Sequence, residues 1–358
     1  MSGAVDWELA ERVATRVAHR GLSQQGLSDP TLEADFAEMT ERAEGLVAAE
    51  TGLHSDRGPA RARVASRTDW IRANIASFQR LLKPLIEQLD DQMGSSRFAP
   101  AGRKVSGAEV GLVLGWMSTR VLGQYDLLIV EDEDPDDQDI VYYVGPNVLT
   151  IEKRFAFPPD EFRLWLALHE VTHRAQFTGV PWLRPHFLSL VEQVLATLDA
   201  DADHFFDGLK QMVLERKAGG KPLEEGGLAH SLASAEQRAI IDQISGMMSL
   251  LEGHGDVTMT RAGADFVPSA RRFARVLQAR RQQSGGATRI LQRLIGLEAK
   301  LKQYEQGEAF IAAVEVAGGR AFFDRVWESP EMLPDLGEIR EPSRWIERVR
   351  SFEDAAAN

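Results

Sequence analysis

The stretch from Pro158 to Gly179 restricts the fold of this chain more than any other segment. Two prolines precede Asp160, whose carboxylate can cap a helix by accepting hydrogen bonds from the first free backbone amides. Apolar residues then recur at intervals of three and four residues, and Gly179 and Pro181 follow as terminating signals. The pattern predicts a helix that is capped by Asp160 and ends at Gly179.

This helix carries the pattern His-Glu-x-x-His at His169, Glu170 and His173. Four residues advance a helix by about one turn, so both imidazoles emerge on one face and can reach the same zinc ion. The neighbouring carboxylate of Glu170 can take a proton from a bound water, which is the arrangement that a metalloprotease needs. The pattern therefore predicts a zinc site with Glu170 as the general base.

The apolar residues Phe162, Trp165 and Leu166 lie one and two turns before His169 on the same side of the helix. They place the two histidines on an inward-facing surface. The alternative is that His169 and His173 are core histidines hydrogen-bonded to carbonyl groups.

A catalytic zinc ion needs a third protein ligand and keeps its fourth position for water. A helix predicted from Ala235 to Thr260 offers Glu252 after the apolar stretch Met247 to Leu251, where an unpaired carboxylate would be costly. Asp256, one turn later, can accept the free ring hydrogen of a ligating histidine. His254 points about 160° away from Glu252 around the helix, so either could be the third ligand, but not both in regular geometry. Another alternative is that Glu252 and His254 pair with surface charges at a fraying helix end.

The composition is that of an ordinary globular protein, with 44% apolar and 27% charged residues in a chain of 358. The formal net charge of −13 disfavours binding to nucleic-acid phosphates or anionic membranes. We interpret the five arginines between Arg271 and Arg281 as the solvated face of a helix. We therefore expect a peptide or small-molecule substrate, with no nucleic-acid partner and no membrane association. Nothing in the sequence fixes the oligomeric state.

The chain contains no cysteine, which excludes disulfides, thiolate zinc ligands and a cysteine nucleophile. The zinc ligands must then be His, Asp or Glu. The segment from Asp6 to His19 is amphipathic and acidic, unlike a signal peptide. The longest apolar run, Val110 to Met117, is too short to cross a bilayer. These features lead us to expect a cytoplasmic protein.

The rest of the sequence predicts a mainly helical protein. Helices are expected over residues 6–20, 30–51, 70–93 (capped by Thr68 or Asp69 and bent at Pro84), 106–123, 183–198 and 203–217, and again between residues 268 and 352. The glycines of 106–123 would allow close packing against a neighbouring helix. The loop Gly219 to Gly227 is a connector or a lid, and it lacks the features of a phosphate-binding loop. We expect an N-terminal helical lobe (1–124), a core (125–262) and a C-terminal helical lobe (263–358), all in one compact unit.

Two segments before the metal-binding helix are rich in β-branched and aromatic residues. Tyr125 to Val130 and Ile140 to Ile151 flank the acidic turn Glu131 to Asp139, which predicts an antiparallel hairpin, with a further strand within Val148 to Lys153. In zinc peptidases an edge strand above the metal-binding helix commonly binds an extended substrate. The alternative is a hairpin that only covers the core.

Five blocks of sequence in the same order carry a resemblance to a known family: Val121–Asp126, Val144–Asn147, His169–Gln176, Met248–His254 and Leu294–Gly307. They resemble the zincin-like metallopeptidases of actinobacteria and related bacteria, which are often associated with the biosynthesis of a deazaflavin coenzyme. The resemblance implies a mainly helical, zincin-like metallohydrolase core. In the wider group the ligand glutamate is commonly followed four residues later by an aspartate, and Glu252 and Asp256 fit that spacing.

These features together predict a zinc-dependent hydrolase, and most specifically a metallopeptidase. His169, His173 and Glu252 would hold the ion, and Glu170 would move the proton. Asp256 or His254 would act as a supporting or alternative ligand. The donors that could stabilise an oxyanion are Tyr142, Tyr143, His230 and His254.

Two other functions stay open at this point. One is a non-catalytic binding or scaffold protein with a structural or vestigial metal site, which a closed four-ligand shell completed by His254 or Asp256 would favour. The other is a small-molecule hydrolase in coenzyme metabolism, which a short cleft rather than a groove along the hairpin edge would favour.

Overall fold

A computed structural model describes residues 5–20, 29–83, 99–126, 139–200, 235–282 and 297–356. Several sequence predictions lie outside these residues. They are the bend at Pro84, the helix over 203–217, the loop Gly219 to Gly227, His230 and the acidic turn up to residue 138.

The chain divides into two compact units, each made of two segments. Unit 1 comprises residues 1–179 and 259–278, and unit 2 comprises residues 180–258 and 279–358. The three-part division expected from the sequence stays a prediction.

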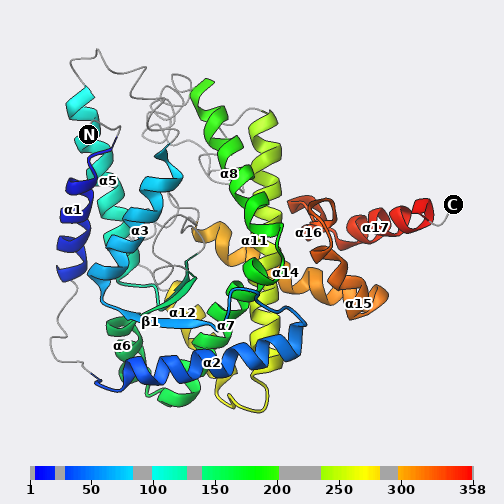
Figure 1. Cartoon of the computed structure of the whole chain (residues 1–358), viewed down its shortest axis with the longest axis horizontal. Helices are drawn as coiled ribbons and strands as arrows, with labels where there is room; N and C mark the ends of the chain where they lie inside the picture. Colours follow the sequence, from blue (N-terminus) through cyan, green and yellow to red (C-terminus); the bar gives the residue numbers. More distant parts are fainter. Residues whose placement is uncertain are drawn as a thin grey trace. The chain divides into compact units, whose positions relative to one another are not determined.

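Unit 1 contains most of the helices that precede residue 180, together with a small sheet (Figure 1). Its elements are α1 (Trp7–Arg20), α2 (Leu32–Thr51), β1 (Arg61–Ala65), α3 (Arg67–Leu81), α5 (Ala99–Ser118), β2 (Gly123–Tyr125), β3 (Ile140–Val144), α6 (Gly145–Phe155) and α7 (Pro159–Gly179), with the end of α11 (Ala235–Ala262) and most of α12 (Ala270–Gln282).

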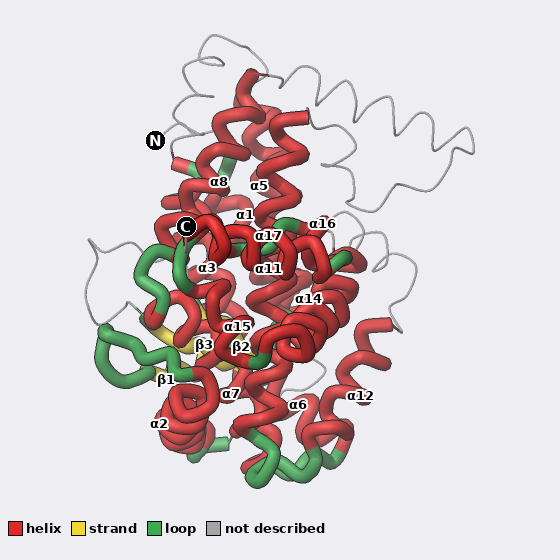
Figure 2. Tube along the Cα trace, turned by 90° about the vertical axis from the view of Figure 1, so that its right-hand side faces the viewer, coloured by secondary structure: helices red, strands yellow, loops and turns green. Residues whose placement is uncertain are grey.

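The sheet has three strands in the order β1-β3-β2, coloured yellow in Figure 2. β3 pairs in parallel with β1 and antiparallel with β2, so the sheet is mixed. β2 lies at an edge of the sheet and contacts α7. The predicted antiparallel pairing and the edge strand next to α7 are present, but β2 is Gly123–Tyr125 and overlaps the predicted strand, Tyr125 to Val130, only at Tyr125. Residues 127–130 of that prediction lie outside the described residues.

The two faces of this sheet are covered by two hydrophobic clusters of unit 1. Val141 and Tyr143 of β3 pack into a cluster with apolar residues of α2, α6, α7 and α12. Ile140, Tyr142 and Val144 pack into a second cluster with α1, α3 and α5. This alternation follows from the two-residue period of a strand, and it places α7 on the Tyr143 face.

Helix α7 is buried along almost its whole length and is held by two buried arginines. Arg163, near its beginning, forms ion pairs with Asp29, Asp35 and Glu152. Arg174, near its end, pairs with Glu44 and Asp139 and also donates to the carbonyl oxygen of Gly58. Removing one partner of such a buried pair costs about 3–5 kcal/mol, so these contacts fix the position of α7 against α2.

Helices α1 and α5 pack closely because glycines of α5 face alanines of α1. A Cβ atom added to Gly111 would lie 2.5 Å from the carbonyl oxygen of Ala10, and one added to Gly115 would lie 2.6 Å from that of Ala14. The expectation that these glycines allow close packing is confirmed.

All the described secondary-structure elements of unit 2 are helices. It contains α8 (Leu183–Ala200), α11 up to Thr258, α14 (Leu297–Gly318), α15 (Arg320–Phe323), α16 (Leu336–Arg340) and α17 (Pro342–Ala356), with the short 3₁₀ helices η2 (Asp324–Trp327) and η3 (Pro330–Met332). Its core is built around Leu250, Phe310 and Trp345. The backbones of α11 and α14 touch at two glycines, because a Cβ on Gly253 would lie 2.4 Å from the carbonyl carbon of Gly307.

The sequence prediction for the strands needs correction after Val144. Gly145 begins α6, so the continuation of the strand to Ile151 and the further strand within Val148 to Lys153 are wrong. Pro146 lies in the first turn of α6, where its fixed φ suits a helix start and its missing N–H is not needed. β1 was not predicted, because it is short, half polar and paired with a strand far away in the sequence.

Several helix boundaries also differ from the prediction. The cap of α3 is Ser66, whose hydroxyl accepts from the amide of Asp69 while Asp69 bonds back, so neither Thr68 nor Asp69 is the cap. α7 begins at Pro159, which puts Asp160 in its first turn rather than at the cap position. α5 runs from Ala99 to Ser118 instead of over 106–123, because the chain leaves the helix in time for Gly123 to enter β2.

The predicted fold class is confirmed, since the described chain is mainly helical with one small sheet. No helix within the described ranges is both long and apolar enough to cross a membrane.

The close packing of α1 and α5 makes a prediction for stability. We expect Gly111→Ala to lower the free energy of unfolding by about 1–3 kcal/mol, because the added methyl group would meet backbone atoms that cannot move aside. Urea unfolding followed by circular dichroism measures the change. Gly102→Ala, in the same helix with nothing within 4 Å, is the control and should be neutral or stabilising. Equal stability of the two variants would contradict the packing argument.

Candidate metal centre

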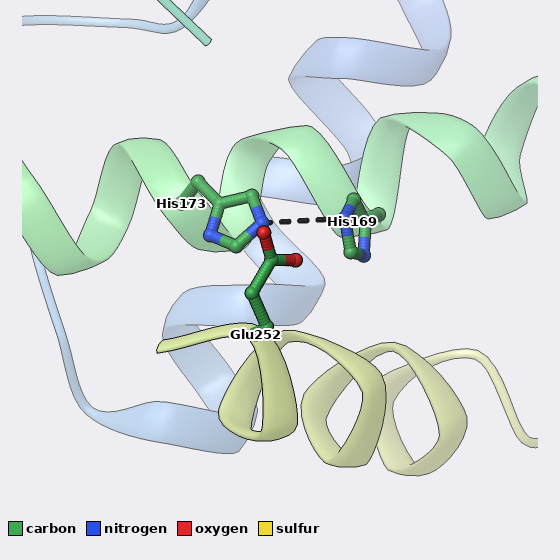
Figure 3. A group of neighbouring side chains, drawn as sticks. All are labelled: His169, His173 and Glu252. Carbon is green, nitrogen blue, oxygen red and sulfur yellow. Dashed lines mark hydrogen bonds between the residues drawn. The ribbon is translucent and has the colours of Figure 1, made fainter. Parts of the chain in front are cut away.

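His169 and His173 lie one turn apart on α7. Both are half-buried, so they are more exposed than the inward-facing pattern predicts. Their Nε2 atoms are 3.2 Å apart, which Figure 3 marks with a dashed line. Two zinc–nitrogen bonds of about 2.0–2.1 Å at a tetrahedral angle would separate the nitrogens by roughly 3.3 Å. The spacing of the two imidazoles therefore fits two ligands of one zinc ion.

The second ring nitrogen of His173 also has a defined partner. Nδ1 lies 3.0 Å from the side-chain oxygen of Gln176, which is buried one turn later on the same helix. An amide oxygen only accepts hydrogen bonds, so this contact places the proton on Nδ1 and leaves the lone pair of Nε2 available to a metal.

Glu252, from α11, completes the group of potential ligands. Its side chain is 4% exposed, and it offers a carboxylate oxygen toward the two imidazoles (Figure 3). One ligand atom from each of His169, His173 and Glu252 lies within 4.8 Å of the others. Two imidazoles and one carboxylate are a donor set that catalytic zinc sites use.

The carboxylate of Glu170 lies against the edge strand β2. Its Oε2 atom accepts a hydrogen bond of 3.1 Å from the backbone amide of Tyr125. A Cβ atom on Gly123 would lie 2.7 Å from both the Cγ and the Oε1 atoms of Glu170. Glu170 therefore occupies space that exists only because residue 123 has no side chain.

The other two residues proposed from the α11 sequence make different contacts. Asp256 hydrogen-bonds with Glu308 of α14. His254 is buried and packs against the rings of Phe323 and Trp327, with centroid distances of 5.9 and 5.1 Å. Among the described residues, the group whose ligand atoms converge contains Glu252 and neither Asp256 nor His254.

Comparison with known proteins supplies the family. The sequence profile of the zincin-like metallopeptidases matches residues 5–346, nearly the whole chain. The chain belongs to the zincin-like metallopeptidase family. The narrower placement, among actinobacterial members associated with a deazaflavin coenzyme, stays a prediction.

One solved structure is similar to this zincin-like chain over almost its entire length. It is the crystal structure of a candidate hydrolase with a novel fold from Chloroflexus aurantiacus, with 32% sequence identity and a TM-score of 0.71. The match covers 97% of this chain and 99% of that chain. No curated protein matches the chain.

The tyrosines suggested as oxyanion donors lie on opposite faces of the sheet in this zincin-like protein. Tyr143 is fully buried on the α7 face, and its hydroxyl lies 2.8 Å from that of Thr40. Burial raises the pKa of Tyr143 well above its usual range, and the negative charge of Glu170 raises this pKa further. Tyr142 packs on the other face, in the cluster that contains Trp70.

Sequence reasoning missed three residues of this zincin-like site: Gly123, Tyr125 and Gln176. Gln176 could have been found from its three-residue spacing to His173, because such a pair meets on one helix face. A glycine inside a short strand signals close approach of another group, which Gly123 illustrates. The contact of Tyr125 is made by its backbone, so its side-chain type gave no signal.

The space at Gly123 makes a prediction for catalysis. A methyl group in Gly123→Ala would push away the flexible end of Glu170, so we expect zinc content to be unchanged and turnover to fall by about 100-fold. Elemental analysis and cleavage of a quenched-fluorescent peptide library measure the two quantities. Gly102→Ala serves as the matched control, and full turnover by the Gly123 variant would show that the position of Glu170 is unimportant.

Proposed function

We propose that this zincin-like protein is a zinc-dependent hydrolase, and specifically a metallopeptidase, in which His169, His173 and Glu252 hold the ion. The observation that carries the proposal is the convergence of these three ligand atoms within 4.8 Å. The membership of the chain in the family supports it. The similar Chloroflexus aurantiacus protein, described as a candidate hydrolase, is consistent with hydrolytic chemistry.

The chemistry divides between the ion and the protein side chains. A zinc ion in this position supplies Lewis acidity, which polarises a substrate carbonyl and makes water acidic enough to react near neutral pH. Glu170 adjoins His169 in the sequence and is 8% exposed. We propose that Glu170 takes the proton from the attacking water and returns it to the leaving amine. The amide of Tyr125 fixes one carboxylate oxygen in this arrangement.

The edge strand β2 supports a peptide as the substrate. Val144 donates to the carbonyl of Leu122, and Asp126 donates to that of Ile140, so alternate residues of this segment face β3. The backbone groups of Gly123 and Tyr125 consequently face the outer edge of the sheet. Glu170 accepts from the Tyr125 amide at this edge, so an extended peptide would pair with the other outward-facing backbone groups of β2 and would run past the proposed base.

The number of converging ligands supports catalysis over a structural metal site. Within the described residues, the group offers three potential ligands, so a tetrahedral zinc ion held by them would keep a fourth position for water or substrate. A shell closed by His254 or Asp256 would have favoured a scaffold role. These two residues instead contact aromatic rings and Glu308.

The metal assignment predicts about one zinc ion per purified chain, measured by elemental analysis. We expect the double variant His169→Ala/His173→Ala to lose the ion. Competition with a chromophoric chelator measures the affinity for zinc. Glu252→Gln should lower this affinity by more than the roughly 10–100-fold expected for loss of a residue that only hydrogen-bonds to a ligand. Asp256→Asn is the control, and an equal loss of affinity there would contradict the assignment of Glu252. If protein supplied with zinc does not bind it, the proposed zinc-dependent hydrolase function is excluded.

The proposed role of Glu170 predicts that its substitution lowers turnover without lowering zinc binding. Glu170→Gln keeps the shape of the side chain but cannot accept the proton, so we expect full zinc content with turnover reduced by about 10²–10⁴-fold. Metal analysis and the peptide-library assay test this on the same preparation. Retained turnover would mean that another group moves the proton.

A further inference from the structure

The hydrogen bond between Tyr125 and Glu170 is one link in a closed circuit within unit 1. The hydroxyl of Tyr125 donates to Oδ1 of Asp139 at 3.1 Å. Asp139 is held by Arg174, whose Nε and Nη2 atoms donate to it at distances between 2.6 and 3.1 Å. Arg174 lies on α7 one turn after Glu170. The hydrogen bonds therefore connect Arg174 of α7 to Asp139, Asp139 to Tyr125, and Tyr125 to Glu170, which is again on α7.

Each member of this circuit is held by more than one contact. The guanidinium of Arg174 is almost fully buried and also binds Glu44 and the carbonyl of Gly58. Asp139 is buried and adopts a left-handed backbone with φ of 54°, which aspartate tolerates better than most residues. The ring of Tyr125 stacks on Phe177 of α7 with centroids 6.4 Å apart. The tyrosine hydroxyl therefore meets a carboxylate that has little freedom to move.

The opposite side of β2 is anchored independently. Gln124 accepts from the indole of Trp70 at 2.8 Å and donates to Asn74 at 3.2 Å. The alternation of a strand directs Gln124 to the α3 face and Tyr125 to the α7 face. The three-residue strand is thus fixed on both faces, and the Tyr125 hydroxyl provides the link on the side of Glu170.

We propose that Tyr125, Asp139 and Arg174 are positioning residues for Glu170, which they orient by fixing the backbone amide that binds its carboxylate. The importance of this for catalysis rests on the proposed function, in which Glu170 moves the proton. The arrangement itself does not depend on bound zinc, so it can be tested in the metal-free protein.

The experiment measures hydrogen exchange of single backbone amides in the full chain by nuclear magnetic resonance. In the wild type we expect the amide of residue 125 to be protected. Glu170→Ala should speed its exchange by at least about tenfold, because the acceptor is gone. Tyr125→Phe keeps the ring on Phe177 but removes the bond to Asp139, and we expect about tenfold faster exchange at the same amide.

The same spectra contain the controls. The amides of Asp126 and Val144 bond across β2 and β3, and they should keep their protection in Tyr125→Phe. Tyr143→Phe removes the matching hydroxyl on the neighbouring strand, which binds Thr40, and should leave exchange at residue 125 unchanged. Unchanged exchange at residue 125 in Tyr125→Phe would overturn the proposal. An equal effect of Tyr143→Phe, or simultaneous loss of protection at Asp126 and Val144, would also overturn it.

A kinetic comparison tests the catalytic consequence. In zinc-loaded protein we expect Tyr125→Phe to lower kcat for peptide cleavage by about tenfold, with zinc content and KM unchanged. An unchanged kcat would refute a positioning role in catalysis. A wild type that binds no zinc and cleaves no peptide would instead refute the proposed function, while the exchange of the residue 125 amide would still decide whether the circuit holds Glu170.

Discussion

The burial of two arginines on one face of α7 is the constraint on which the rest of unit 1 depends. Arg163 and Arg174 are eleven residues apart, close to three full helical turns, so their side chains leave the helix in nearly the same direction. Each is buried, and each must be matched by carboxylates, because an unpaired guanidinium in the interior would be very costly. The acidic partners come from α2, from α6 and from the segments just before α2 and β3, which contain Asp29 and Asp139.

The buried arginines also determine which face of α7 carries the two histidines. His169 and His173 point about 80–140° away from the two arginines around the helix, so the face that carries the candidate ligands is separate from the anchored face. Once the arginines fix the rotation of α7, the direction of the imidazoles is fixed as well. Gln176 then sets the tautomer of His173 from the same helix. The two imidazoles are thereby oriented in advance, which would lower the cost of ordering them around the proposed zinc ion.

Close backbone contacts place the elements around the site. In unit 1, α1 and α5 touch through Gly111 and Gly115, and Glu170 fills the space left by Gly123. In unit 2, Gly253 lets α11 touch α14 directly after Glu252. At each of these positions only glycine fits without displacing its neighbours, because the methyl group of an alanine would lie closer than 3 Å to neighbouring atoms.

The sequence by itself determined the helical character of the chain, the His-Glu-x-x-His pattern on α7 and the choice of Glu252 as the candidate third ligand. These follow from local periodicity and from the rule that a carboxylate in an apolar stretch needs a partner. Only the tertiary structure decided that β1 joins the sheet, that the chain turns into a helix after Val144 and that Tyr125 holds Glu170. It also placed Asp256 beside Glu308 and His254 among aromatic rings. Such contacts join residues far apart in the chain, and some use backbone groups that every residue possesses, so no local pattern encodes them.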